Sequence, residues 1–182
     1  MQRRDNMDSK EVRFLKLGAL FVYLGGTINH SFGAWTGFHG VSPSDESVFQ
    51  HSRMVVLPWV LFLIACWWRR RDNEFSKLPQ NHIAGAASLV VQSFGVVGFY
   101  YFFCSGFGLH GLALDIINFT LITALGVAVW IWVGRYKLDF YVDAAAAFVV
   151  YAALFSMQLF CTYGKCDGNA FVDFSTRNES QC

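Results

Sequence analysis

Four ionisable side chains in this sequence lie near the ends of long apolar stretches. His30 follows the first stretch, while Glu46 and His51 precede the second. Asp115 lies near the start of the fourth. Two imidazoles and two carboxylates at one depth can serve as acid, base and orienting group, or can bind a divalent metal. The predicted catalytic set is therefore His30, Glu46, His51 and Asp115, with a divalent metal as candidate cofactor.

Glu46 fits this set less well than the other three, because of its spacing. Glu46 and His51 are five residues apart, so on a regular helix they point about 140° from one another. The preceding Ser42-Pro43 pair is typical of a helix start, where an acidic residue also suits the helix dipole. The alternative is a purely structural role, in which these groups only cap helices or face water. The tighter predicted metal group is His30, His51 and Asp115.

The composition indicates where such a site would lie. The chain has 182 residues, of which 54% are hydrophobic and 18% aromatic, and its charged residues gather in a few short runs. Long charge-poor segments between such runs are typical of a multi-pass membrane protein. A net charge of +1 argues against a nucleic-acid partner. The N-terminus lacks a small-residue cleavage pattern, so we expect no removable signal peptide.

The apolar stretches predict an all-α, integral membrane bundle of five transmembrane helices in a single domain, 1–182. Each span needs about 20 mostly apolar residues. Pro58 is expected to kink the second span, which gains a lead-in turn if its helix begins at Pro43. The spans cover residues about 14–30, 54–68, 83–103, 112–133 and 140–160, and a polar tail follows at 161–182.

The distribution of Lys and Arg predicts the orientation. Ten of these residues lie in the N-terminal tail and in the connections after the second and fourth spans, whereas the two other connections hold Arg53 alone. Basic segments stay on the cytoplasmic side. We therefore expect the N-terminus to be cytoplasmic and the C-terminus to be outside or lumenal. The ten residues are Arg3, Arg4, Lys10, Arg13, Arg69, Arg70, Arg71, Lys77, Arg135 and Lys137.

Small and polar residues recur at helical spacing inside the spans, which predicts close helix packing. Two sets stand out: Gly18, Gly25 and Asn29 in the first span, and Gly85, Ser88, Gln92 and Gly95 in the third. Asp143, near the inner end of the fifth span, is expected to pair with Arg135 or Lys137. A disulfide is expected among the outer cysteines if that side is oxidising. These cysteines are Cys104, Cys161 and Cys166.

Two segments resemble a family of small multi-pass membrane proteins that is known only as a domain of unknown function. They are Gly26-Thr27-x-x-His30 and Ser42-Pro43-x-Asp45-Glu46-Ser47-x-Phe49-Gln50-His51. The family pattern at the second segment is close to S-P-x-N-E-S-x-W-E-H, so Gln50 stands where the family has an acid. That replacement argues against a mechanism with two carboxylates beside His51. The resemblance implies five spans and no known activity.

Three classes of function remain open. The first is a structural, binding or accessory component of the membrane, with a lipid or a membrane protein as partner. The second is an interfacial, metal-dependent hydrolase acting on lipid at the outer leaflet through the residues above. The third is a small transporter with a polar path along Gln92, Asp143 and Gln158. In each case we expect an integral membrane protein, with the plasma membrane or the secretory pathway as the favoured location.

Overall fold

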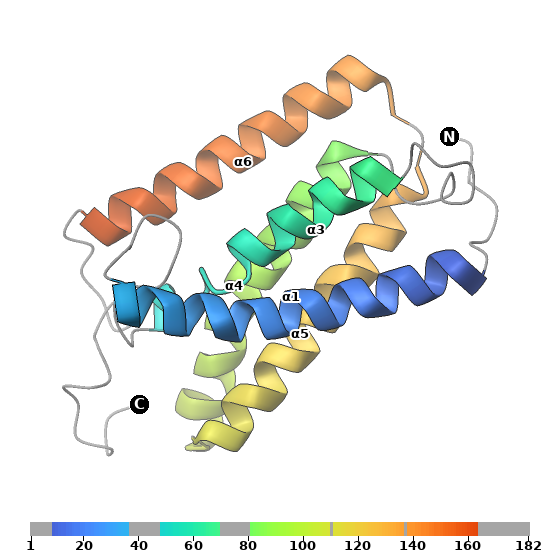
Figure 1. Ribbon diagram of the computed structural model, residues 1–182. Helices are drawn as coiled ribbons and strands as arrows, with labels where there is room; N and C mark the ends of the chain where they lie inside the picture. Colours follow the sequence, from blue (N-terminus) through green and yellow to red (C-terminus); the bar gives the residue numbers. More distant parts are fainter. Residues whose placement is uncertain (1–8, 37–47, 70–80, 110, 137, 164–182) are drawn as a thin grey trace.

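The computed structural model describes residues 9–36, 48–69, 81–109, 111–136 and 138–163, and in these segments the chain is all-helical, as predicted. Five long helices and one short helix follow each other along the chain (Figure 1). They are α1 (Ser9–Thr36), α2 (Val48–His51), α3 (Val56–Arg69), α4 (His82–Phe107), α5 (Leu112–Gly134) and α6 (Phe140–Tyr163). The predicted helix start at Ser42 and Pro43 lies outside the described residues.

The helices agree closely with the predicted spans. By length and composition, four stretches of the described chain can cross a membrane: Phe49–Arg69, His82–Cys104, Ala113–Gly134 and Phe140–Cys161. Helix α1 has 28 residues but is not among the four. Charged side chains in its first two turns and polar ones near Asn29 and His30 lower its hydropathy. A crossing by α1 therefore stays a prediction.

The helices form two groups around the antiparallel pair α4 and α5. Helix α6 packs along α4, and α1 lies across α3 and α5 (Figure 1). The starts of α1, α4 and α6 and the ends of α3 and α5 meet at one end of the bundle, at the right and upper right of Figure 1. We call it the basic end, because Arg69 and Arg135 lie there. The opposite end is called the distal end.

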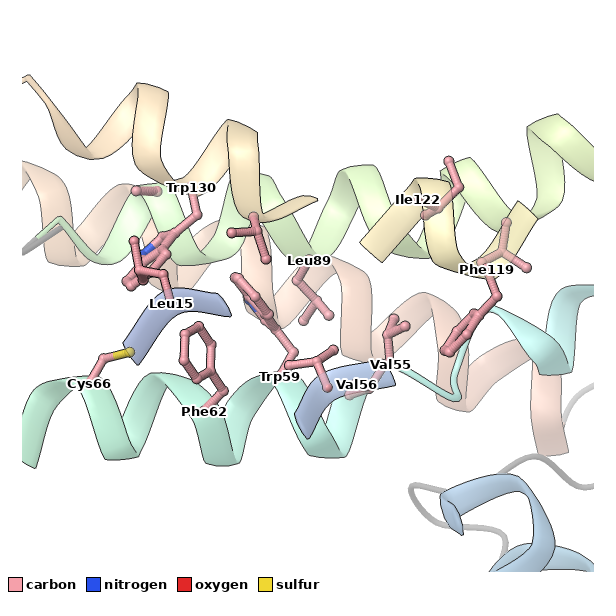
Figure 2. Close-up of a cluster of buried hydrophobic side chains, with 14 of the residues drawn as sticks. Leu15, Val55, Val56, Trp59, Phe62, Cys66, Leu89, Phe119, Ile122 and Trp130 are labelled. Atoms are coloured by element: carbon pink, nitrogen blue, oxygen red, sulfur yellow. The ribbon is translucent and has the colours of Figure 1, made fainter. Parts of the chain in front are cut away.

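Aromatic rings fill the centre of the bundle. Trp59 and Phe62 of α3 face Trp130 of α5 with ring centroids 6.0 and 5.4 Å away, and all three side chains are almost fully buried (Figure 2). The Trp59 indole also donates a hydrogen bond of 3.1 Å to the Gly85 carbonyl of α4. A buried indole needs such an acceptor, because an unpaired N–H in the core costs free energy. Trp59 thereby fixes α3 to α4.

Glycines bring α1 into close contact with these helices. A Cβ atom on Gly18 would lie 1.9 Å from Cε2 of Phe62, and one on Gly26 would lie 2.5 Å from Cζ of Phe119. A Cβ on Gly25 would touch the Pro58 ring at 3.0 Å. Any larger residue at Gly18 or Gly26 would push the helices apart. The packing predicted for the first glycine stripe is therefore confirmed.

Candidate functional site

The predicted histidines come together at the distal end. The ring of His30, on α1, lies over the ring of His51, the last residue of α2, with centroids 4.9 Å apart and planes 30° apart. Both side chains are half-buried. The two residues are 21 positions apart in sequence, so only the packing of α1 against the start of the second span brings them together.

The structure describes only one of the two predicted carboxylates, Asp115. Asp115 lies in the first turn of α5, is exposed, and interacts electrostatically with His51. Glu46 lies outside the described residues. Within the described chain, no group of three or more His, Cys, Asp or Glu side chains is arranged to hold a metal ion. The metal group of His30, His51 and Asp115, and the catalytic set with Glu46, stay predictions.

A break between α2 and α3 positions His51. Residues 52–55 form turns, and the N–H groups of Ser52, Arg53 and Met54 bond carbonyls three residues back, as in Met54 N to His51 O at 3.1 Å. Pro58 explains part of this break, because it has no N–H to donate to the carbonyl of Met54, four residues earlier. Asn29 of α1 donates to that carbonyl at 3.4 Å and to the Arg53 carbonyl at 3.5 Å. A kink was predicted at Pro58; the irregularity instead lies just before it, at residues 52–55, and α1 stabilises it.

These hydrogen bonds explain why the histidines meet. Asn29 precedes His30 directly, so the bonds from its amide fix the turn of α1 that carries His30 against the turn that follows His51. On the other side of the turn, the fully buried Arg53 guanidinium donates to Oε1 of Gln50 at 2.9 Å. Gln50 thus serves as a buried acceptor for Arg53.

A second polar group lies at the basic end, and it corrects one prediction. The buried Asp143 carboxylate of α6 accepts hydrogen bonds from the backbone N–H of His82 at 2.7 Å and of Ile83 at 3.0 Å. It also bonds Nδ1 of His82 at 2.9 Å. Among the described residues, Asp143 therefore pairs with His82 and the first N–H groups of α4 and not with Arg135, while Lys137 lies outside the described residues. A carboxylate suits this position, because the first N–H groups of a helix have no partner within the helix.

A cavity of about 640 Å³ opens beside this pair. It lies between α3 and α6, two helices that barely touch, and residues of α4 and α5 complete its lining. Most of its lining is aliphatic or aromatic, and its polar groups belong to Asn81, His82 and Tyr151. The volume is typical of a site for a small molecule. The lining residues from α3, for example, are Val60, Leu63, Ile64, Cys66 and Trp67.

The polar side chains expected to line a transport path mostly take part in contacts between helices. Gln92 is fully buried and donates to the Ser88 hydroxyl at 3.1 Å, which in turn donates to the Gly126 carbonyl at 2.7 Å. Asp143 is held by α4 as described above, and Gln158 is buried. The cavity lies toward the basic end, whereas a transport path needs an opening at mid-depth. These contacts support helix packing for Gln92 and Asp143.

Sequence reasoning missed His82 and the role of Tyr151 in the cavity. His82 follows the basic connection and begins a long apolar run, a position typical of an ordinary helix start. Its partner Asp143 is 61 residues away, so no spacing rule connects them. One available signal was that Asp143 lies at the same predicted membrane end as His82. The helical stripe shared by Asp143 and Tyr151 was another.

Apolar helices of this length and a cavity between two of them define an all-helical protein with the features of an integral membrane protein. The chain matches the model of a family of unknown function (DUF6512) over residues 1–176 and belongs to that family. No curated protein and no solved structure matches it. The predicted membership of an uncharacterised family is confirmed.

Proposed function

We propose that this protein is an integral membrane binding component that takes the hydrocarbon part of a lipid-like molecule into the cavity between α3 and α6. The observation that carries the proposal is the cavity itself, about 640 Å³ with a mostly apolar lining. A gap between two membrane-crossing helices faces lipid, so a chain can enter it from the side without crossing water. Lipid chains are also the most abundant apolar molecules around such a helix bundle.

The depth of the cavity supports this occupant. On α3 the lining extends from Val60 to Trp67, a rise of about 10 Å along the helix. One leaflet contributes about 15 Å of hydrocarbon, half of the bilayer core. The polar lining residues Asn81 and His82 lie at the basic end, where a lipid headgroup of that leaflet would be. A single chain with its polar head at this end matches the cavity in depth and polarity.

The test fills the cavity with a larger side chain. Val60→Trp places an indole in the cavity, and Leu61→Trp places the same indole on an exposed face outside the lining. Native mass spectrometry of the purified proteins, with methyl oleate added in detergent, measures the bound chain. We expect Val60→Trp to lose binding and Leu61→Trp to retain it. Equal binding by the wild type and both variants, or no binding by the wild type, would refute the proposed function.

The cysteines support the predicted orientation. Cys104 and Cys161 lie near the distal ends of α4 and α6 and are both disulfide-bonded, whereas Cys66, toward the basic end of α3, is a buried thiol. Disulfides persist in oxidising compartments. In this proposal the distal end faces the outside or lumen and the N-terminus faces the cytoplasm. A membrane-impermeant maleimide should then label Asp8→Cys and Ser175→Cys from opposite sides, and labelling from one side would contradict the orientation.

A second candidate is an interfacial, metal-dependent hydrolase acting on lipid at the outer leaflet. The specific observation in its favour is the contact between His30 and His51, with Asp115 in electrostatic range of His51. Rings this close can share a ligand after a small rotation of either side chain. Asp115 would supply an oxygen ligand or orient one imidazole, and Glu46 would act as base.

Metal content tests this candidate. The purified protein should carry about one zinc or similar ion, which His51→Ala and His30→Ala should lose. His82→Ala is the matched control, because it removes a histidine from the basic end and should leave the metal in place. A wild-type protein without metal after exposure to zinc, or equal metal in all three variants, would eliminate the metal-dependent hydrolase.

A further inference from the structure

The polar side chains of the cavity gather at one end of it. His82 and Gly85 lie three residues apart on α4 and therefore share a face of that helix. A Cβ on Gly85 would lie 2.8 Å from the Tyr151 hydroxyl, so the phenol of α6 reaches across the cavity to the same turn. A phenol hydroxyl and an imidazole thus lie, with the Asn81 amide, at the basic end of a cavity whose remaining lining is mostly apolar.

The Tyr151 hydroxyl is available to a ligand. It forms no hydrogen bond with any residue that the structure describes, although its ring is part of the cavity lining. A hydroxyl in an apolar surrounding needs a partner, because its desolvation is otherwise uncompensated. Gly85 leaves the space into which this hydroxyl points.

His82 offers a hydrogen-bond acceptor beside it. Its Nδ1 faces the Asp143 carboxylate at 2.9 Å, and a carboxylate only accepts, so Nδ1 carries the proton. In the neutral ring Nε2 is then an acceptor. This nitrogen has no hydrogen-bond partner in the described chain, and the His82 side chain is 46% exposed.

We infer that the polar end of the cavity, formed by His82 and Tyr151, binds the hydroxyl group of a single-chain, uncharged amphiphile such as a long-chain alcohol. This inference rests on the proposed binding function and specifies its ligand class. The ligand hydroxyl donates to Nε2 of His82 and accepts from the hydroxyl of Tyr151. The hydrocarbon chain then follows the apolar lining between α3 and α6.

The surrounding charges favour a neutral head over a charged one. Asp143 is 4% exposed, and its two oxygens already accept three N–H groups, so it is closed to a cationic head. An anionic head would approach the negative charge of Asp143, which repels it. A hydroxyl avoids both penalties and satisfies both polar groups.

Four molecules with the same C18 chain test the inference: oleyl alcohol, oleic acid, oleylamine and the hydrocarbon cis-9-octadecene. Competition between pairs of them for the purified full-length protein, read by native mass spectrometry, gives relative affinities. The alcohol should bind best. Tyr151→Phe removes only the hydroxyl and should lower alcohol binding about three- to tenfold, while binding of cis-9-octadecene, which has no polar group, is unchanged. Tyr141→Phe, at an exposed tyrosine of the same helix outside the lining, is the matched control and should match the wild type.

The outcomes separate this inference from the proposed function. If the acid or the amine binds as well as the alcohol, or if Tyr151→Phe leaves alcohol binding unchanged, the inferred hydroxyl site is wrong. The cavity would still be a chain-binding site as long as Val60→Trp abolishes binding of methyl oleate. If Tyr151→Phe lowers binding of the alcohol and of cis-9-octadecene equally, the phenol acts through packing, and the inference is likewise overturned.

Discussion

Gly18 provides a direct test of how α1 packs against α3. In Gly18→Ala the new methyl group would lie 1.9 Å from Cε2, 2.6 Å from Cζ and 2.7 Å from Cδ2 of Phe62. The Phe62 ring is 2% exposed and is held by Phe14, Trp59 and Trp130, with centroids 5.4 to 6.1 Å away. The ring therefore has little room to move, and α1 must shift outward instead.

The magnitude follows from two opposing effects. Overpacking of a core by one methyl group costs about 1–3 kcal/mol, and three short contacts with a trapped ring suggest the upper part of that range. Alanine in place of a mid-helix glycine stabilises the helix by about 0.5–1 kcal/mol, because it has less backbone entropy to lose on folding. We therefore expect Gly18→Ala to lower the free energy of unfolding by about 1–2 kcal/mol.

Gly98→Ala is the matched control. Gly98 lies inside α4 and is exposed, and a Cβ atom there would meet no neighbouring atom within 4 Å, so only the gain in helix propensity remains. Unfolding of both variants in mixed detergent micelles, followed by circular dichroism, gives the two changes. Destabilisation of Gly18→Ala should also shrink in the background of Phe62→Leu, which removes the clashing ring atoms. A Gly18→Ala protein as stable as Gly98→Ala would refute the packing of α1 on Phe62.

Three further substitutions test the polar contacts by the same unfolding assay. Asp143→Ala removes a buried carboxylate with three hydrogen bonds and should lower the free energy of unfolding by about 2–4 kcal/mol. Asp139→Ala, the control, removes an exposed helix cap and should cost about 1 kcal/mol. Equal losses in the two variants would contradict the cap that Asp143 provides for α4. Asn29→Ala removes the side-chain amide that donates to the carbonyls of Arg53 and Met54, so a loss of about 1–2 kcal/mol is expected. Ser31→Ala, at an exposed position of the same helix, should change stability by less than about 0.5 kcal/mol. Trp59→Phe retains most of the ring but loses the indole hydrogen bond to α4, so a loss of about 1–2 kcal/mol is expected, and an unchanged midpoint would argue against that bond.

Much of the fold was predictable because a membrane-crossing helix is encoded locally. Each apolar run is long enough by itself to form a helix, so the predicted spans 83–103, 112–133 and 140–160 lie within α4, α5 and α6 with small differences at the ends. An irregularity near Pro58 was also predictable, because proline removes a backbone donor wherever it occurs, but it takes the form of turns at residues 52–55 and not of a kink at Pro58. The proximity of His30 and His51 was anticipated from their shared depth alone.

Contacts between helices were decided only by the tertiary structure. Sequence proximity suggested Arg135 or Lys137 as the partner of Asp143, yet the packing of α6 on α4 places the first N–H groups of α4 and the ring of His82 there instead. The cavity exists because α6 packs on α4 and not on α3, which leaves a gap between α3 and α6. No local sequence pattern encodes that gap. The apolar runs of a sequence determine which segments become helices, but the rotation and spacing of those helices depend on contacts between residues far apart in the chain. For this protein, the sequence alone determined the helices, and their packing decided which polar side chains face the same space.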